Sequence, residues 1–170
     1  MIRSHALAVA LVALAASGCK SSLPEDLGTV EAGKAAIAAV QTKLGTKDIA
    51  VHRLDLEHDK ITLRVVDPKD PKKILEFDAE KGEMVGPSPV GRVGDTTSDV
   101  IAVKVADLDF AGLAKAEAEC KTKLGQPSVK LSLWDGVDIV HHERGPQKWI
   151  VNTKDGKFCR ASLPGVIDFP

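Results

Sequence analysis

Histidine and carboxylate side chains are the groups in this chain that could hold a metal ion or transfer a proton. His141 and His142 are adjacent in a predicted strand, so their side chains point to opposite faces and do not easily share one ion. His52 and His58 lie six residues apart across a predicted turn, a spacing that matches no metal-binding pattern. We expect surface histidines, no metal site and no cofactor.

Catalytic motifs are missing from the sequence. It contains no G-x-S-x-G elbow, no H-E-x-x-H or C-x-x-C pair, and no glycine loop of the kind that binds phosphate. The acidic clusters at residues 57–59 and 67–70 fall in predicted turns, where solvated charge is the usual role. We therefore predict that the protein is not an enzyme.

Residues 1–18 have the composition of a targeting signal. Arg3 gives a positive start, and residues 6–16 are an unbroken run of eleven Ala, Leu and Val residues. This length suits a signal-peptide core and is well short of the roughly 20 apolar residues that span a bilayer. The following Ala16-Ser17-Gly18-Cys19 resembles a bacterial lipobox, which implies cleavage before Cys19 and lipid attachment to it. The alternative is an ordinary secretory peptide cleaved after residues 13–15.

The cysteine count supports the lipid anchor. The chain has three cysteines, so pairing of two would leave one thiol in an oxidising compartment unless lipid caps it. Two or more acyl chains hold a protein stably at a membrane, at about 0.8 kcal/mol per buried methylene. Lys20 stands where many inner-membrane lipoproteins carry aspartate, so the resemblance implies the periplasmic side of the outer membrane. Residues 19–28 would then form a short tether.

Composition is that of a folded domain with no nucleic-acid partner. Hydrophobic residues make up 44% of the chain, which is enough for a core. Removing residues 1–18 takes away one basic residue and no acidic one, so the net charge of −1 becomes −2. Nucleic-acid binding requires a basic surface, so we expect the membrane as a partner, through Cys19, and no nucleic acid.

A pattern of one helix followed by short strands occurs twice. Thr29 and Asp109 are N-cap candidates 80 residues apart, and TKLG at residues 42–45 recurs at 122–125, where a glycine ends each predicted helix. We predict an α+β fold of two repeats, each with one helix packed on an antiparallel β-meander. Chance similarity between two amphipathic helices is the alternative.

The predicted repeats cover residues 29–86 and 108–170, and residues 87–107 form a linker that can add an edge strand at 100–105. A change of hydrophobic phase predicts a β-bulge near residues 52–53. The predicted strands are residues 49–57, 61–67, 74–78, 84–85, 129–134, 137–143, 148–153 and 158–163.

The remaining two cysteines test the repeat. Aligning the two helices places Cys120 over Val40, and aligning the turn glycines Gly82 and Gly156 places Cys159 over Val85. An apolar contact in one repeat therefore corresponds to a disulfide in the other. Closing a loop of about 40 residues would stabilise a small unit by up to roughly 4 kcal/mol. Two buried free thiols are the alternative, but the export signal favours the bond between Cys120 and Cys159.

The end of the first repeat, residues 73–85 (KILEFDAEKGEMV), resembles the strand–Asp–x–x–x–Gly–Glu–strand ending of PepSY domains, which are small exported helix-and-sheet modules. The second repeat matches more loosely, with Asn152 in place of the aspartate and Lys157 in place of the glutamate. Tandem copies of such a unit are also similar to β-lactamase-inhibitor-like proteins. The resemblance implies a non-catalytic binding or inhibitory role in the cell envelope.

Strand alternation selects the partner-binding candidates. If Val129, Leu131, Leu133, Trp149 and Val151 face the helix, the residues that face away include an apolar group, namely Trp134, Val140, His142 and Ile150. An exposed apolar patch marks a contact site, unless the other repeat covers it. We predict a membrane-anchored envelope lipoprotein that binds an unidentified envelope protein, with inhibition of a peptidase or other envelope protein as one form of this role. An assembly scaffold at the outer membrane, or periplasmic binding of a metal or small molecule, are the alternatives.

Overall fold

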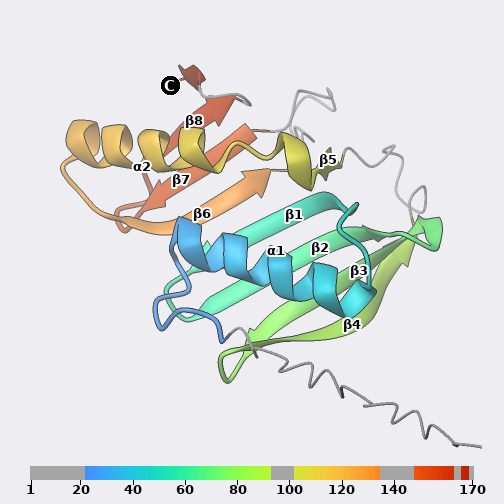
Figure 1. Cartoon of the computed structure of the whole chain (residues 1–170). Helices are drawn as coiled ribbons and strands as arrows, with labels where there is room; N and C mark the ends of the chain where they lie inside the picture. The colour runs from blue at the N-terminus through green and yellow to red at the C-terminus, as the bar shows by residue number, and fades with distance from the viewer. Residues whose placement is uncertain (1–21, 93–101, 135–147, 163–165, 169–170) are drawn as a thin grey trace, which may run out of the picture.

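The computed structural model describes residues 22–92, 102–134, 148–162 and 166–168, and it shows an α+β fold with two α-helices and one antiparallel sheet (Figure 1). The helices are α1 (Val30–Leu44), the short 3-10 helix η1 (Val105–Asp107) and α2 (Phe110–Leu124). The strands are β1 (Ala50–Glu57), β2 (Lys60–Asp67), β3 (Asp70–Glu80), β4 (Glu83–Arg92), β5 (Val103–Lys104), β6 (Ser128–Trp134), β7 (Lys148–Thr153), β8 (Phe158–Ser162) and β9 (Val166–Asp168).

All the strands belong to one sheet, in the order β4-β3-β2-β1-β6-β7-β8-β9, with β5 paired to β1 off this path. The strands that follow α1 and those that follow α2 join where β1 pairs with β6. The prediction of an α+β fold with an antiparallel sheet is therefore confirmed, and the sheet is continuous across both parts of the chain.

Both long helices begin and end where the capping residues predict. The Thr29 side chain accepts a hydrogen bond from the Ala32 N–H (3.1 Å), and the Asp109 carboxylate accepts one from the Gly112 N–H (2.8 Å). Each helix ends at a glycine with a φ of 67°, Gly45 after α1 and Gly125 after α2. A left-handed residue at this position costs glycine little, so each glycine stops its helix.

The two helices cover the same face of the sheet: α1 lies over β1–β4 and α2 lies over β6–β8 (Figure 1). One buried cluster joins the two helices to the strands beneath them. The alternation of buried positions is regular, as in β2, where Ile61, Leu63 and Val65 are all fully buried. Phe110 at the start of α2 packs on Trp149 of β7, with ring centroids 5.8 Å apart.

Several strand predictions are confirmed, and some bounds differ. The register of β1 against β2 shifts between Val51 and Arg53, where the bulge was predicted. β4 continues to Arg92 through residues predicted to be linker, because prolines are tolerated in a strand at the edge of a sheet. The predicted edge strand is shorter, β5, and it pairs with β1. The predicted strand at residues 137–143 lies outside the described residues.

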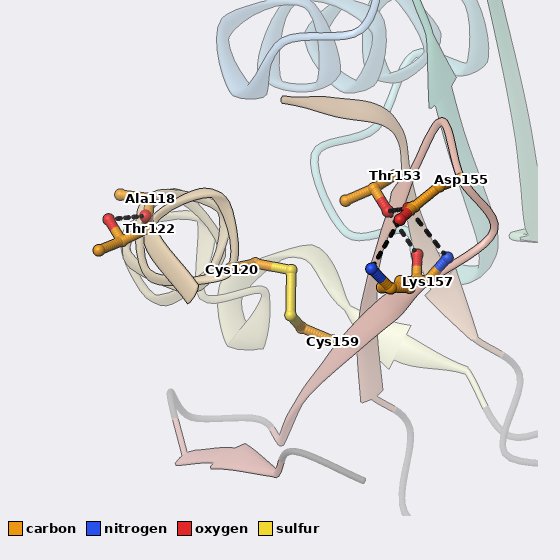
Figure 2. The surroundings of a disulfide bond; sticks show 7 residues. All are labelled: Ala118, Cys120, Thr122, Thr153, Asp155, Lys157 and Cys159. Carbon is orange, nitrogen blue, oxygen red and sulfur yellow. Dashed lines mark hydrogen bonds and ion pairs between the residues drawn. A yellow bond between two sulfur atoms is a disulfide. The ribbon is translucent and has the colours of Figure 1, made fainter. Parts of the chain in front are cut away.

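The disulfide joins Cys120 of α2 to Cys159 of β8, as predicted, and both cysteines are buried (Figure 2). The predicted equivalence of Cys159 with Val85 is wrong. Val85 is 45% exposed and faces away from α1, whereas its neighbour Met84 is buried. The two hairpins differ in length: Glu80 pairs with Glu83 across two residues, whereas the Thr153 N–H donates to the Lys157 carbonyl across three. The side-chain phase therefore shifts by one residue.

Candidate binding face

The face of the sheet opposite the helices carries charged side chains on four adjacent strands. Alternation turns every second residue of β3, β2, β1 and β6 toward this face. We call this side of the sheet the open face, and in it lies a hollow of about 330 Å³. It is lined by Arg53, Asp55, Glu57, Lys60, Thr62, Arg64, Glu76, Asp78 and Lys130.

Ion pairs connect the open face from strand to strand. Between β2 and β3, the Arg64 Nε lies 2.6 Å from a Glu76 carboxylate oxygen. The β1–β6 connection is made by Lys130, whose Nζ lies 2.9 Å from Glu57 and 3.6 Å from Asp55. Cross-strand pairs of opposite charge stabilise a sheet modestly. They also hold the paired side chains in fixed positions.

Thr62 and Asp78 extend this network toward β4. The Thr62 hydroxyl donates a hydrogen bond to the Asp78 carboxylate (2.8 Å), and the two residues are direct partners across β2 and β3. The hollow is therefore lined by polar side chains that position one another.

Asp55 and Ser132 form the centre of the open face and have hydrogen-bonding capacity left over. The two residues are direct partners across β1 and β6, and their exposed fractions are 7% and 8%. The Asp55 Oδ2 accepts a hydrogen bond from the Arg53 Nε (2.7 Å). The Asp55 Oδ1 and the Ser132 Oγ are buried and have no hydrogen-bond partner in the part of the chain that the structure describes. Buried polar atoms without a partner are rare, so this pair marks a place where an external hydrogen-bonding group would be favoured.

The four predicted partner-binding residues are placed only in part. Ile150 of β7 is half-buried on the open face, opposite Ser132 and Arg160. Trp134 ends β6, and its backbone pairs with Lys148, but its side chain is not among the described ones. Val140 and His142 lie outside the described residues. The structure therefore does not bring the four together as a described patch.

The inward-facing predictions for β6 and β7 are mostly confirmed. Leu131, Leu133, Trp149 and Val151 are buried against the helices. Val129 is an exception, with 44% of its surface exposed, because the register of β6 against β7 shifts between Ser128 and Lys130. Sequence periodicity could not show this irregularity at the strand end.

A second hollow, of about 280 Å³, lies at the C-terminal end of α1. It is lined by Lys43, Leu44, Asp67, Pro68, Lys69, Leu75 and Pro87. Its charged residues, Lys43, Lys69 and Asp67, lie in or beside turns and at the last turn of a helix, where such residues are ordinary. The open face is therefore the better candidate site.

Among the described residues, no three or more His, Cys, Asp or Glu side chains are grouped closely enough to hold a metal ion. His52 lies at the bulge of β1, and His58 lies in the turn before β2, where its Nδ1 is 3.1 Å from the Asp26 carboxylate. His141 and His142 are outside the described residues, so the absence of a metal site stays a prediction.

The charged centre of the open face was missed by the sequence analysis, although a signal was present. Arg53, Asp55 and Glu57 are spaced by two in β1, and Lys60, Thr62 and Arg64 have the same spacing in β2. Polar residues at every second position on two paired strands predict a polar sheet face. The apolar residues of the later strands predict a patch that includes Trp134 instead.

Comparison of the chain with protein-family models, with curated proteins and with solved structures found no match. Among the described residues, no helix is both long enough and apolar enough to cross a membrane. The function is therefore argued from the site itself.

Proposed function

We propose that the protein is a membrane-anchored, non-catalytic binding module of the cell envelope, and that the open face binds a protein partner. The observation that carries this proposal is the central pair, Asp55 and Ser132. Their buried oxygen atoms lie beside a charged hollow and have no hydrogen-bond partner among the described residues. A partner that donates hydrogen bonds there would satisfy both groups. Leaving them unsatisfied costs each about 1–3 kcal/mol.

The chemistry of the open face favours a partner with a basic side chain at its centre. An ionised carboxylate accepts hydrogen bonds and donates none, so an arginine or lysine head group would give the strongest hydrogen bond to the Asp55 Oδ1. Acidic groups of the partner would lie over Arg53, Arg64 and Lys130, which surround the centre. Complementary charge of this kind mainly sets specificity and the rate of association, so binding should weaken as salt rises.

The anchor and the internal duplication are parts of the same proposal. The lipobox-like residues 16–19 support lipidation of Cys19 and a place at the outer membrane, and residues 73–85 support the likeness to PepSY domains. The two 15-residue helices support duplication, since they start and end at equivalent positions. They also share a detail: Thr42 donates to the Ala38 carbonyl and Thr122 to the Ala118 carbonyl, both at 2.9 Å.

Site-specific photo-crosslinking tests the binding face in cells that make the protein. A photoreactive residue at position 62 would lie on the open face, whereas one at Lys115 would lie on the outer surface of α2. We expect a discrete cross-linked protein from position 62 only. The adduct should disappear when Lys130→Glu is added, and should persist when the control Lys115→Glu is added. Equal cross-linking from both positions, or adducts insensitive to Lys130→Glu, would rule out the open face as the binding surface.

A further inference from the structure

The segment predicted to be a short tether is fixed to the domain from Leu23 onward. Leu23 is 7% exposed and belongs to the main buried cluster. Its backbone N–H donates to the carbonyl of Gly82, in the turn between β3 and β4, at 2.8 Å. The Leu27 N–H donates to the carbonyl of His58, in the turn between β1 and β2, at 3.0 Å. We call residues 23–28 the strap, because they cross both turns before α1 begins.

Side-chain contacts hold the C-terminal end of the strap, next to α1. The Asp26 carboxylate accepts a hydrogen bond from the Gly28 N–H (3.0 Å), and the Asp26 carbonyl accepts one from the hydroxyl of Thr29 (3.2 Å). A Cβ added to Gly28 would lie 3.2 Å from the His58 backbone nitrogen, so the strap approaches the turn closely. The N-cap residue of α1 and the turn before β2 therefore fix the direction in which the chain enters the domain.

This geometry limits the distance between Cys19 and the domain. Four residue steps separate Cys19 from Leu23, and at about 3.3–3.6 Å per residue they span at most about 14 Å. The 57–60 and 80–83 turns lie at the same end of the sheet, because β1–β4 are antiparallel. The opposite end, with Lys69 in the turn between β2 and β3, is roughly 25 Å further away at about 3.3 Å per strand residue.

We infer that the end of the domain formed by the 57–60 and 80–83 turns lies on the surface of the membrane, at the level of the lipid head groups. This inference rests on the proposed lipid anchor at Cys19. The partner of this end of the domain is the lipid bilayer, because the chain leaves the domain there and only residues 20–22 separate Leu23 from the lipidated Cys19. Asp59, Lys60, Glu80 and Lys81 are exposed at this end and carry both signs of charge, which keeps the turns in the hydrated head-group layer.

The orientation has a consequence for the open face. In this orientation the strands that begin and end at the 57–60 and 80–83 turns run away from the bilayer, so the open face is roughly perpendicular to the membrane surface. A partner that binds there would approach from the side, close to the membrane surface. The position of the strap therefore determines the direction from which a partner reaches the open face.

Depth-dependent quenching tests the inference on the full-length lipidated protein in phosphatidylcholine vesicles that contain a head-group nitroxide lipid. One fluorophore is attached at Lys81→Cys and, in a matched variant, at Lys69→Cys. We expect several-fold stronger quenching at position 81 than at position 69. Insertion of a Gly/Ser linker of about 20 residues between Lys20 and Ser21 should make quenching at the two positions equally weak, because a flexible chain of that length no longer restricts the domain.

A second variant tests the strap itself, and mass spectrometry separates the two proposals. Leu23→Asp places a charge in the buried cluster and should abolish the difference between positions 81 and 69 while the lipid stays attached. Equal quenching at both positions in the lipidated parent would overturn the orientation and leave the anchor standing. Unmodified Cys19 in the mass spectrum of protein from membranes would overturn the anchor, and the orientation with it.

Discussion

The contact between helix and sheet is made by apolar packing under α1 and by a covalent bond under α2. In the N-terminal part, Val40 of α1 and Met84 of β4 are both buried in the main cluster. In the C-terminal part, Cys120 of α2 is bonded to Cys159 of β8, 39 residues further along the chain. The difference matches the size of the sheet in each part. α1 lies over four strands that pair over long stretches, whereas the C-terminal part ends in the short strands β8 and β9. The smaller part of a core gains most from a covalent constraint.

Loss of the disulfide should have the largest effect. We expect Cys120→Ala with Cys159→Ala to lower the free energy of unfolding by up to about 4 kcal/mol, because the bond closes a loop of about 40 residues in the unfolded chain. Denaturant titration of the lipid-free domain, with and without reductant, measures this loss. The double variant serves as the control, since its stability should not depend on reductant. If reductant left the parent unchanged as well, the C-terminal part would be held by packing alone, as the N-terminal part is.

The buried residue of β4 comes next in size. Met84→Ala should lower the free energy of unfolding by about 2–3 kcal/mol, because it leaves a cavity between α1 and the sheet that an edge strand can partly close. Val85→Ala is the matched control and should change it by less than about 0.5 kcal/mol, because Val85 is 45% exposed. Denaturant titration of both variants measures the difference. A larger loss from Val85→Ala than from Met84→Ala would restore the equivalence of Val85 with Cys159.

Most of the secondary structure could be predicted because local chemistry determines it. The caps Thr29 and Asp109 and the terminal glycines set both helices, and the phase change before Leu54 set the bulge in β1. The length of β4 could not be predicted in the same way. A run of Gly and Pro is typical of a loop, and only the position at the sheet edge, which depends on tertiary pairing, allows it to be a strand.

The candidate site was predictable in outline only. Alternation placed Trp149 and Val151 correctly in the core, but for the opposite face it predicted an apolar patch and not the charged residues of the open face. The central pair of Asp55 and Ser132 depends on the pairing of β1 with β6, which brings together residues 77 positions apart in the chain. Nothing local in either strand specifies that partner, so the sequence could not indicate which polar residues meet.

Helix caps allow a closer comparison of the two parts. Thr29→Ala and Asp109→Ala should each lower the free energy of unfolding by about 1 kcal/mol, because each removes the acceptor for an N–H in the first turn. Only the Asp109→Ala loss should shrink at high salt, since only Asp109 also places a charge at the positive end of a helix. Thr29→Ser and Asp109→Asn keep the acceptor and are the controls. Identical salt dependence of the two losses would contradict this account.

The smallest effect should come from the turn between β7 and β8, and it should be lost in acid. Asp155 lies 2.9 Å from the Lys157 ammonium and accepts a hydrogen bond from the Thr153 hydroxyl at 2.6 Å (Figure 2). The hydrogen bond to the Lys157 side chain, followed by that from Thr153, lowers the pKa of Asp155 from 3.8 to about 2. The corresponding turn between β3 and β4 is Lys81-Gly82 and has no such carboxylate.

The sign of the pH effect follows from the lowered pKa. The folded state stabilises the ionised carboxylate of Asp155 relative to the unfolded chain. This stabilisation is therefore complete above the unfolded-state pKa of 3.8 and is lost as pH falls through about 2. The stability difference between the parent and Asp155→Asn should therefore be constant down to about pH 5 and shrink between about pH 4 and 2. Denaturant titrations across this range measure it. Lys157→Met should move the loss of stabilisation to higher pH, because it removes the strongest cause of the lowered pKa of Asp155. If the stability difference between the parent and Asp155→Asn persisted unchanged below pH 2, the stabilisation would come from the uncharged hydrogen bonds of this hairpin instead.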